Sequence, residues 1–220
     1  MRNYKFDSDE LFKFSCSLPY NNIREDLLAL FNSLNCLKEK YNFPAINNDI
    51  GSFISVSLKL WKPKIIFEMG SGYGHSSFWY LLNHNDDLKK IYLTEKRNDL
   101  QDEFESLDWP LDWRKKLDYF QGDAFDRILQ IKENIDLALI DGVKGDYLKF
   151  LKILEDKLSV NGVVLIDNSY WRGSFLNKEL RLSKKSAKNI YDLHDYISKS
   201  DKWTATFIPY KDGLTVLTLS

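Results

Sequence analysis

The glycine-rich segment at residues 64–77, KIIFEMGSGYGHSS, constrains this chain more than any other stretch. The apolar run at 65–67 predicts a buried strand, which ends at Glu68 and three alternate glycines before a segment that suits a helix. Glycines let the backbone turn sharply and let a ligand approach the main chain without meeting a Cβ atom. The following helix would point its N-terminal N–H groups at an anionic part of that ligand.

Strands and helices are predicted to alternate after this segment. Apolar runs predict strands at 90–94, 117–121, 135–140 and 163–166, the last after a turn at Asn161 and Gly162. Helices are expected at 76–82, 98–107, 124–131, 144–158 and 184–200. Continuous apolar strands are typical of a parallel sheet buried on both faces. Strands at 203–208 and 214–219 have so short a connection that they must be antiparallel. The predicted fold is a doubly wound, Rossmann-like α/β sheet of about seven strands, mostly parallel, with a C-terminal antiparallel hairpin and helices on both faces.

The N-terminal part is predicted to be helical and to cap this core. We expect an irregular arm over residues 1–20, a helix from Asn21 or Asn22 to about Lys40, and a helix at 48–61. With 220 residues, of which 44% are hydrophobic, the chain can bury one core, so a single domain over 1–220 is predicted, with 1–62 as cap and 63–220 as core. Cys16 and Cys36 lack metal-ligand spacing and are expected to be buried thiols rather than a disulfide.

Charge and hydropathy exclude some classes of partner. Lys plus Arg (31) nearly balance Asp plus Glu (32), which gives no general attraction for nucleic acid or an anionic membrane. Residues 1–20 mix charges with aromatic side chains and do not resemble a signal or transit peptide, and no apolar run reaches membrane-spanning length. A cytoplasmic protein with no membrane partner is therefore expected.

Polar residues follow each of the first five predicted strands. A single acid at a strand end is more often a turn former or helix cap, because Asp and Asn suit those positions. Polar residues at five successive strand ends argue against all of them being turn formers or caps, because ligands of such sheets bind beyond the carboxyl ends of the strands. These residues are Glu68, Glu95, Asp123, Asp141, Asp167 and Asn168.

Glu95 indicates the kind of ligand. It lies 21 residues beyond Gly74, where an acid after the second strand can accept hydrogen bonds from both hydroxyls of a ribose. An adenosine-type ligand is therefore expected. The G-x-G-x-G spacing and the terminal antiparallel hairpin favour S-adenosylmethionine over a dinucleotide.

Asp141, Asp167 and Asn168 indicate a cation site. Two carboxylates and an amide oxygen are hard ligands that suit Mg²⁺, or another divalent cation, better than zinc. Lys144 follows Asp141 by three residues, and a lysine beside a divalent cation has its charged form disfavoured, so it could act as a general base. The alternative is that Lys144 is a solvated residue in the first turn of a helix.

Together these motifs resemble the metal-dependent, S-adenosylmethionine-dependent O-methyltransferases, the class I family that includes catechol and caffeoyl-CoA O-methyltransferases. The resemblance covers the chain from about Pro44 to its C-terminus. The aspartate–asparagine pair followed by Tyr-Trp-Arg-Gly is the specific signal, whereas the glycine motif indicates only a methyltransferase. The matching segments are residues 68–76, 136–147, 161–173 and 212–216.

This resemblance implies a role for each matching residue. Asp141, Asp167 and Asn168 would bind Mg²⁺, and Lys144 would take the proton from the substrate hydroxyl. Glu95 would hold the ribose and Ser76 the methionine carboxylate of the cofactor. The other residues expected around the cofactor are Ile46, Glu68, Gly70, Gly72, Asp123, Ala124 and Asp141.

The methyl acceptor is the least constrained part. Tyr170, Trp171 and Arg172 are candidate substrate contacts, and the basic stretch at 170–189 is either a solvated surface or a contact for an anionic substrate, such as a coenzyme A thioester or RNA. A catechol-like or hydroxycinnamoyl-type small molecule is favoured. A sugar or natural-product acceptor, a hydroxylated tRNA base and a non-catalytic cofactor-binding protein are the alternatives. The N-terminal helices could also support a homodimer.

Overall fold

The computed structural model describes residues 8–18, 23–209 and 212–220, without the side chains of Ser8, Leu11 and Phe12. Its contacts divide the chain into two compact units. The sheet unit comprises Pro63–Ser71, Asp87–Asn98 and Lys116–Ser220, and the helical unit comprises Met1–Lys62, Gly72–Asp86 and Asp99–Lys115. The predicted boundary between cap and core, after residue 62, is thus one of several points where the chain passes from one unit to the other. That the whole chain forms a single domain stays a prediction.

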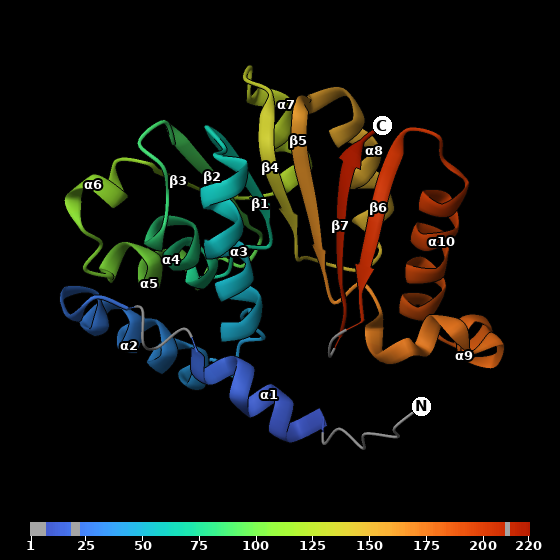
Figure 1. Ribbon diagram of the computed structural model, residues 1–220, viewed down its shortest axis with the longest axis horizontal. Helices are drawn as coiled ribbons and strands as arrows, with labels where there is room; N and C mark the ends of the chain where they lie inside the picture. Colours follow the sequence, from blue (N-terminus) through green and yellow to red (C-terminus); the bar gives the residue numbers. More distant parts are fainter. Residues whose placement is uncertain (1–7, 19–22, 210–211) are drawn as a thin grey trace. The chain divides into compact units, whose positions relative to one another are not determined.

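The sheet unit contains one seven-stranded sheet in the order β3-β2-β1-β4-β5-β7-β6 (Figure 1). The first five strands pair in parallel, and β7 runs antiparallel to both β5 and β6. The doubly wound, Rossmann-like sheet with a C-terminal antiparallel hairpin is therefore confirmed. The strands are β1 (Ile65–Met69), β2 (Lys90–Glu95), β3 (Leu117–Gln121), β4 (Ile135–Ile140), β5 (Leu158–Asp167), β6 (Trp203–Ile208) and β7 (Leu214–Leu219).

Register brings the polar strand ends together. Met69 pairs with Thr94 of β2 and with Ile140 of β4, and Ile140 also pairs with Ile166 of β5. Parallel strands in this register end at the same edge of the sheet. Glu68 and Asp167, at the ends of β1 and β5, and Asp141, directly after β4, consequently lie at one edge of the sheet, as their positions in the sequence predict.

In the described part of the sheet unit the helices are α7 (Ala124–Gln130), α8 (Tyr147–Lys157), the 3-10 helix η2 (Trp171–Leu176), α9 (Lys178–Ser183) and α10 (Lys185–Lys199). Apolar side chains of α8 and α10, including Phe150, Leu154 and Ile190, form one core with residues of the sheet such as Ala138 and Val164. This burial is the main stabilising contribution that the helices make to the sheet.

Two predicted boundaries in this unit are wrong. Asn161 and Gly162 lie inside β5 rather than in a turn, because pairing with β4 continues on both sides of a register shift between Ile135 and Leu137. Lys144 lies in a turn before α8 rather than inside the helix, because the Asp146 N–H bonds the Val143 carbonyl at 2.8 Å and delays the helix start to Tyr147.

The helical unit consists of α1 (Ser8–Ser17), α2 (Glu25–Lys40), α3 (Asn48–Trp61), α4 (His75–Leu82), α5 (Gln101–Ser106) and α6 (Leu111–Arg114). Aromatic packing forms its core: the Phe31 ring lies 4.9 Å from Phe78 and edge-on to Trp79 at 5.6 Å. A Cβ atom on Gly51 of α3 would meet the Trp79 ring at 2.3 Å, so this glycine permits close approach of the two helices.

Two further expectations fail in the helical unit. The predicted arm over 1–20 contains the helix α1, whose first turn carries Asp9 and Glu10, where acids favour helix formation; residues 1–7 and 19–20 lie outside the described part of the chain. Cys16 and Cys36 are free thiols, as expected, but Cys36 is exposed and Cys16 is half-buried, rather than both being buried. Among the described residues, no helix is both long and apolar enough to cross a membrane.

Candidate active site

The edge of the sheet unit beyond β1, β2 and β4 is built by main-chain hydrogen bonds. The N–H groups of Gly70 and Ser71 both donate to the Thr94 carbonyl, at 3.0 and 2.9 Å, and the Asp141 N–H donates to the Met69 carbonyl at 3.0 Å. These bonds fix the points at which the chain leaves the strands. The side chain of Asp141 is therefore placed at the end of β4 by backbone geometry.

Gly70 lies where two parts of the backbone nearly touch. It adopts a φ of +92°, and a Cβ atom there would lie 2.2 Å from the carbonyl oxygen of Asp141. A positive φ is strained for residues with side chains, and a backbone oxygen cannot move aside as a flexible side chain can. Only glycine fits this turn.

Lys144 connects the ends of β4 and β5. Its ammonium nitrogen lies 3.1 Å from the Asn168 Oδ1 atom and 4.0 Å from the nearer carboxylate oxygen of Asp141. It also donates to the Tyr147 hydroxyl, which in turn donates to the Asp167 carbonyl at 3.2 Å. The structure thus brings together the four residues predicted from sequence, Asp141, Lys144, Asp167 and Asn168, in what we call the strand-end cluster.

Electrostatics in the strand-end cluster oppose full ionisation. Burial, then repulsion from Asp167, raises the pKa of Asp141 well above its usual value, while Lys144 lowers it and Glu68 and Glu95 raise it further. Burial lowers the pKa of Lys144, although Asp141 and Asp167 oppose that change. Several acids that repel one another form a site where a cation would be stabilised, and the depressed pKa of Lys144 makes it easier to deprotonate.

Tyr147 is a member of this site that sequence reasoning missed. Its helical spacing with aliphatic residues places it on the buried face of α8, where it is fully enclosed. Burial, together with Asp141 and Asp167, raises the pKa of its phenol, so the hydroxyl stays protonated and donates to Asp167. A tyrosine in an otherwise aliphatic stripe is the available signal, because a buried phenol needs a hydrogen-bond partner.

The donor set fits a hard divalent cation. Asp167 is buried and held by the Asn168 N–H, which donates to its Oδ1 atom at 2.7 Å, and Asn168 adopts a φ of +49°. Two carboxylates and one amide oxygen at adjacent strand ends are ligands that Mg²⁺ accepts. No group of three or more His, Cys, Asp or Glu side chains with a metal-binding arrangement occurs in the described part of the chain, so a cation here would depend on Asn168.

Glu95, Asp123 and Ala124 lie along the neighbouring strand ends of the sheet unit. The Glu95 carboxylate is buried at the end of β2 and accepts from the Arg97 N–H at 2.9 Å. Asp123 caps α7 by accepting from the Phe125 N–H at 3.0 Å, and it pairs with Lys96 at 3.0 Å. Ala124, the first residue of α7, is buried. Asp123 therefore has a structural role as the N-terminal cap of α7, and this role does not depend on a ligand.

Three of the predicted cofactor residues belong to the helical unit. Ile46 is buried, Ser76 is buried in the first turn of α4, and Gly72 adopts a φ of +56°. A Cβ atom on Gly72 would meet the Phe43 ring at 2.5 Å. His75 begins α4 and packs against the rings of Phe31 and Tyr73.

The three candidate substrate residues, Tyr170, Trp171 and Arg172, have different surroundings. The Lys144 ammonium lies 5.2 Å from the centre of the Trp171 ring, which places Trp171 beside the strand-end cluster. Tyr170 instead stacks on Phe207 of β6, with 6.2 Å between ring centres. Arg172 is largely exposed and lies 3.9 Å from Asp212. Trp171 is therefore the candidate substrate residue that lies beside Lys144.

Comparison with known proteins decides the family. The profile described as O-methyltransferase matches residues 25–219. The chain belongs to the O-methyltransferase family. The predicted enzyme class, an S-adenosylmethionine-dependent O-methyltransferase, is thereby confirmed.

Individual relatives are distant. This O-methyltransferase is 26% identical over 193 residues to caffeoyl-CoA O-methyltransferase of Medicago sativa, covering 81% of the chain and 76% of the relative. It is 24% identical over 189 residues to caffeoyl-CoA O-methyltransferase 2 of Eucalyptus globulus, with the same coverage.

Solved structures show the same fold. The O-methyltransferase TomG from Streptomyces achromogenes, in complex with SAM, aligns with a TM-score of 0.82 and 18% identity over 100% of this chain and 99% of TomG. The SAH-bound methyltransferase PaMTH1 of Podospora anserina aligns with a TM-score of 0.78 and 18% identity over the same shares.

Proposed function

We propose that this O-methyltransferase transfers a methyl group from S-adenosylmethionine to one of two adjacent oxygens of a small molecule, of the catechol or hydroxycinnamoyl type. Asp141, Asp167 and Asn168 would hold Mg²⁺ or another divalent cation, and Lys144 would be the general base. The observation that carries this proposal is the position of the Lys144 nitrogen, 3.1 Å from Asn168 Oδ1 and 4.0 Å from Asp141.

Lys144 is suited to accept a proton at Nζ. Burial lowers its pKa, so its neutral form is easier to reach than that of an exposed lysine. The hydroxyl of Tyr147 and the ring of Trp171 lie against its side chain and restrict its position. A base held in place in this way needs little reorganisation when the acceptor hydroxyl arrives.

Asp141, Asp167 and Asn168 would orient the acceptor through the cation. A bound divalent cation would supply Lewis acidity that lowers the pKa of a coordinated hydroxyl. The chain supplies the rigid support: the Asp141 main chain bonds β1, and the Tyr147 hydroxyl bonds the Asp167 carbonyl. Acceptors with two adjacent oxygens match such a site because both oxygens can bind at once.

The methyl donor would lie along the same edge of the sheet unit. The positive methyl-bearing sulfur of S-adenosylmethionine supplies the transferable methyl group. Glu95 would accept hydrogen bonds from the ribose, and the turn at Gly70 and Ser71, fixed by its bonds to Thr94, would lie beside the donor. By the same proposal, Glu68, Asp123, Ala124 and Asp141 of the sheet unit also contact the donor, while Ile46, Gly72 and Ser76 stay predicted cofactor residues of the helical unit.

The basic stretch at 170–189 offers limited support for an anionic acceptor. The Arg181 guanidinium donates to the carbonyls of Phe175 and Leu176 and lies over the Tyr191 ring, and Lys188 pairs with Asp192. These cations therefore have structural roles within the sheet unit. The balanced net charge favours a small molecule over RNA, and the caffeoyl-CoA relatives favour hydroxycinnamoyl acceptors.

A panel of acceptors tests the proposed function. The full chain is incubated with methyl-labelled S-adenosylmethionine, Mg²⁺ and catechols, hydroxycinnamoyl thioesters, sugars or total tRNA. Transfer to acceptors with adjacent hydroxyls, and little transfer to the matched compounds with a single hydroxyl, is expected. Equal transfer to single-hydroxyl acceptors, or transfer only to sugars or tRNA, would contradict it.

A further inference from the structure

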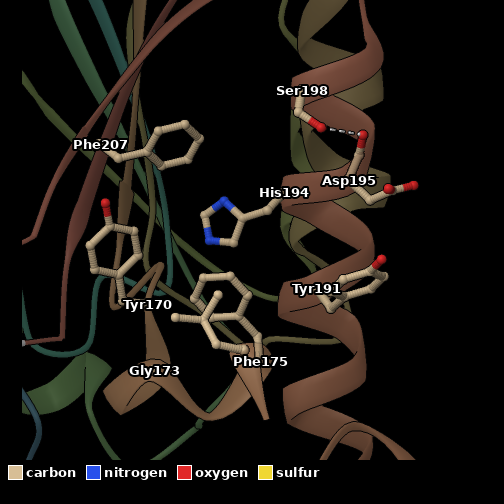
Figure 2. Close-up of a pocket in the computed structure, with 9 residues that line it drawn as sticks. Tyr170, Gly173, Phe175, Tyr191, His194, Asp195, Ser198 and Phe207 are labelled. Carbon is tan, nitrogen blue, oxygen red and sulfur yellow. Dashed lines mark hydrogen bonds between the residues drawn. The ribbon is translucent and has the colours of Figure 1, made fainter. Parts of the chain in front are cut away.

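An aromatic pocket of about 610 Å³ opens in the sheet unit beside α10 (Figure 2). The His194 ring projects from α10 toward three aromatic side chains, Tyr170, Phe175 and Phe207, which come from the segment after β5, from η2 and from β6. Its volume lies within the roughly 300–1,000 Å³ that is typical of small-molecule sites. The lining residues that matter for its chemistry are Tyr170, Phe175, His194, Asp195 and Phe207.

His194 places a hydrogen-bond acceptor in the wall of this pocket. Its Nε2 atom lies 2.5 Å from the Ser169 carbonyl oxygen, which can only accept, so Nε2 carries the proton. Burial lowers the pKa of His194 and keeps the ring neutral near pH 7, although the bond to Ser169 opposes this change. In the neutral ring Nδ1 is then an acceptor.

This acceptor lacks a partner. His194 is 9% exposed, and its buried Nδ1 atom has no hydrogen-bond partner among the described residues. A buried polar atom without a partner is costly, so a ligand that donates to it gains affinity. Phe207 is only half-buried on the edge strand β6, which leaves its ring room to turn as a donor approaches.

The walls favour a planar and uncharged ligand. The Phe175 and Phe207 ring centres lie 4.6 and 5.0 Å from that of His194, and Tyr170 lies nearly parallel to Phe207 with an 18° angle between the rings. Flat aromatic surfaces stack well on another ring. The one carboxylate in the lining, Asp195, is paired with Lys199 at 2.7 Å, so the pocket offers little for a charged group.

We infer that this aromatic pocket binds a neutral planar aromatic ligand with one O–H or N–H donor, which hydrogen-bonds to Nδ1 of His194. The aromatic pocket shares no residue with the strand-end cluster. The two are nevertheless connected, because the carbonyl that His194 holds belongs to Ser169, the residue after Asn168. Thr215 also donates to the Ser169 hydroxyl at 2.8 Å, so this segment is held on two sides.

Indole and benzofuran form the matched pair of probes. They have nearly the same size and shape, but only indole has an N–H donor. The full chain is labelled at its three histidines, His75, His84 and His194, and titrated with each probe while imidazole signals are followed by NMR. The His194→Gln variant assigns the His194 signal, because glutamine can still donate to Ser169. Saturable binding of indole that shifts the His194 signal is expected, with benzofuran binding about five- to tenfold more weakly.

Two variants locate the binding. Phe207→Leu keeps an apolar wall but removes an aromatic face, and it should weaken indole binding about three- to tenfold. Lys144→Met alters the strand-end cluster and should leave indole binding unchanged. The NMR titration needs no methyl transfer. The inference can therefore fail while the proposed function stands, and the proposed function can fail while the inference stands.

Three results would overturn the inference. Equal affinity for indole and benzofuran would remove the role of Nδ1. Indole binding that Phe207→Leu leaves intact, or that Lys144→Met abolishes, would place the probe elsewhere. Self-association of the chain that blocks the probe would show that a second copy fills the aromatic pocket.

Discussion

Replacing Gly70 with alanine should strongly destabilise the protein, because the added Cβ has no room. Gly70 has a φ of +92°, and its Cβ would lie 2.2 Å from the carbonyl oxygen and 2.8 Å from the carbonyl carbon of Asp141. Both atoms belong to the main chain of Asp141, whose N–H group donates a hydrogen bond to the Met69 carbonyl of β1. Relief therefore requires the end of β4 to move, and with it a member of the strand-end cluster.

Gly173 provides a matched control. It also has a positive φ, +68°, but no described heavy atom lies within 4 Å of a Cβ built there. The left-handed conformation costs about 1–2 kcal/mol, and the loss of freedom in the unfolded chain offsets about 0.4–1 kcal/mol, so Gly173→Ala should cost about 0–1.6 kcal/mol. Overpacking adds about 1–3 kcal/mol for Gly70→Ala, for a total of about 1–4.6 kcal/mol.

Urea denaturation followed by circular dichroism measures both variants against the parent chain. Equal m-values would show that the same amount of surface unfolds, so that the difference in midpoint reports the free energy of unfolding. Gly70→Ala should be less stable than Gly173→Ala by about 1–3 kcal/mol. If the two variants lose the same stability, the close approach of Gly70 to Asp141 does not constrain the fold, and the reasoning fails.

Three other perturbations test separate parts of the account. Excess chelator should abolish methyl transfer and added Mg²⁺ should restore it, whereas full activity in chelator would exclude a role for the cation. Burial, with a smaller effect of Lys38, lowers the pKa of His75 to about 3, so the unfolded chain binds more protons than the folded chain between about pH 3 and 6.5. The free energy of unfolding should therefore fall, by up to about 1.4 kcal/mol per pH unit, as pH decreases through that window, and His75→Gln should lack this component; parallel pH profiles in urea titrations would contradict it. Tyr147→Phe should cost about 1–3 kcal/mol in the same denaturation assay, since the Asp167 carbonyl loses its phenol donor, and unchanged stability would argue against that bond.

The sheet was predictable from local sequence because its central strands β1, β2 and β4 are apolar runs buried on both faces. Strands at 117–121, 135–140, 203–208 and 214–219 have the predicted bounds, as does the helix at 48–61. The strand-end residues of the site followed from the same reasoning, because parallel register gathers strand ends at one edge. Asn161 and Gly162 were misplaced because a sequence typical of turns was overridden by pairing between β4 and β5.

Side chains that act through distant partners could not be predicted. Tyr147 bonds Asp167, and His194 bonds Ser169, across 20 and 25 residues of sequence. Neither partner is identifiable before the strands and helices are placed. The start of α8 was missed for a related reason, since the turn at 143–146 depends on a single main-chain bond rather than on apolar periodicity.

The central claim is that Lys144 removes the proton from the acceptor hydroxyl. Its most direct test is the turnover rate of Lys144→Met on the best acceptor, measured beside Lys149→Met, which changes an exposed lysine of α8. Lys144→Met should reduce kcat by a factor of about 10²–10⁴, whereas the kcat of Lys149→Met should stay near that of the parent chain. The affinity of Lys144→Met for S-adenosylhomocysteine, measured by calorimetry, should be unchanged. Because the neutral amine is required, kcat of the parent chain should rise with pH at values below the ordinary lysine pKa, and this rise should be absent from Lys144→Met. Normal turnover in Lys144→Met would contradict the claim.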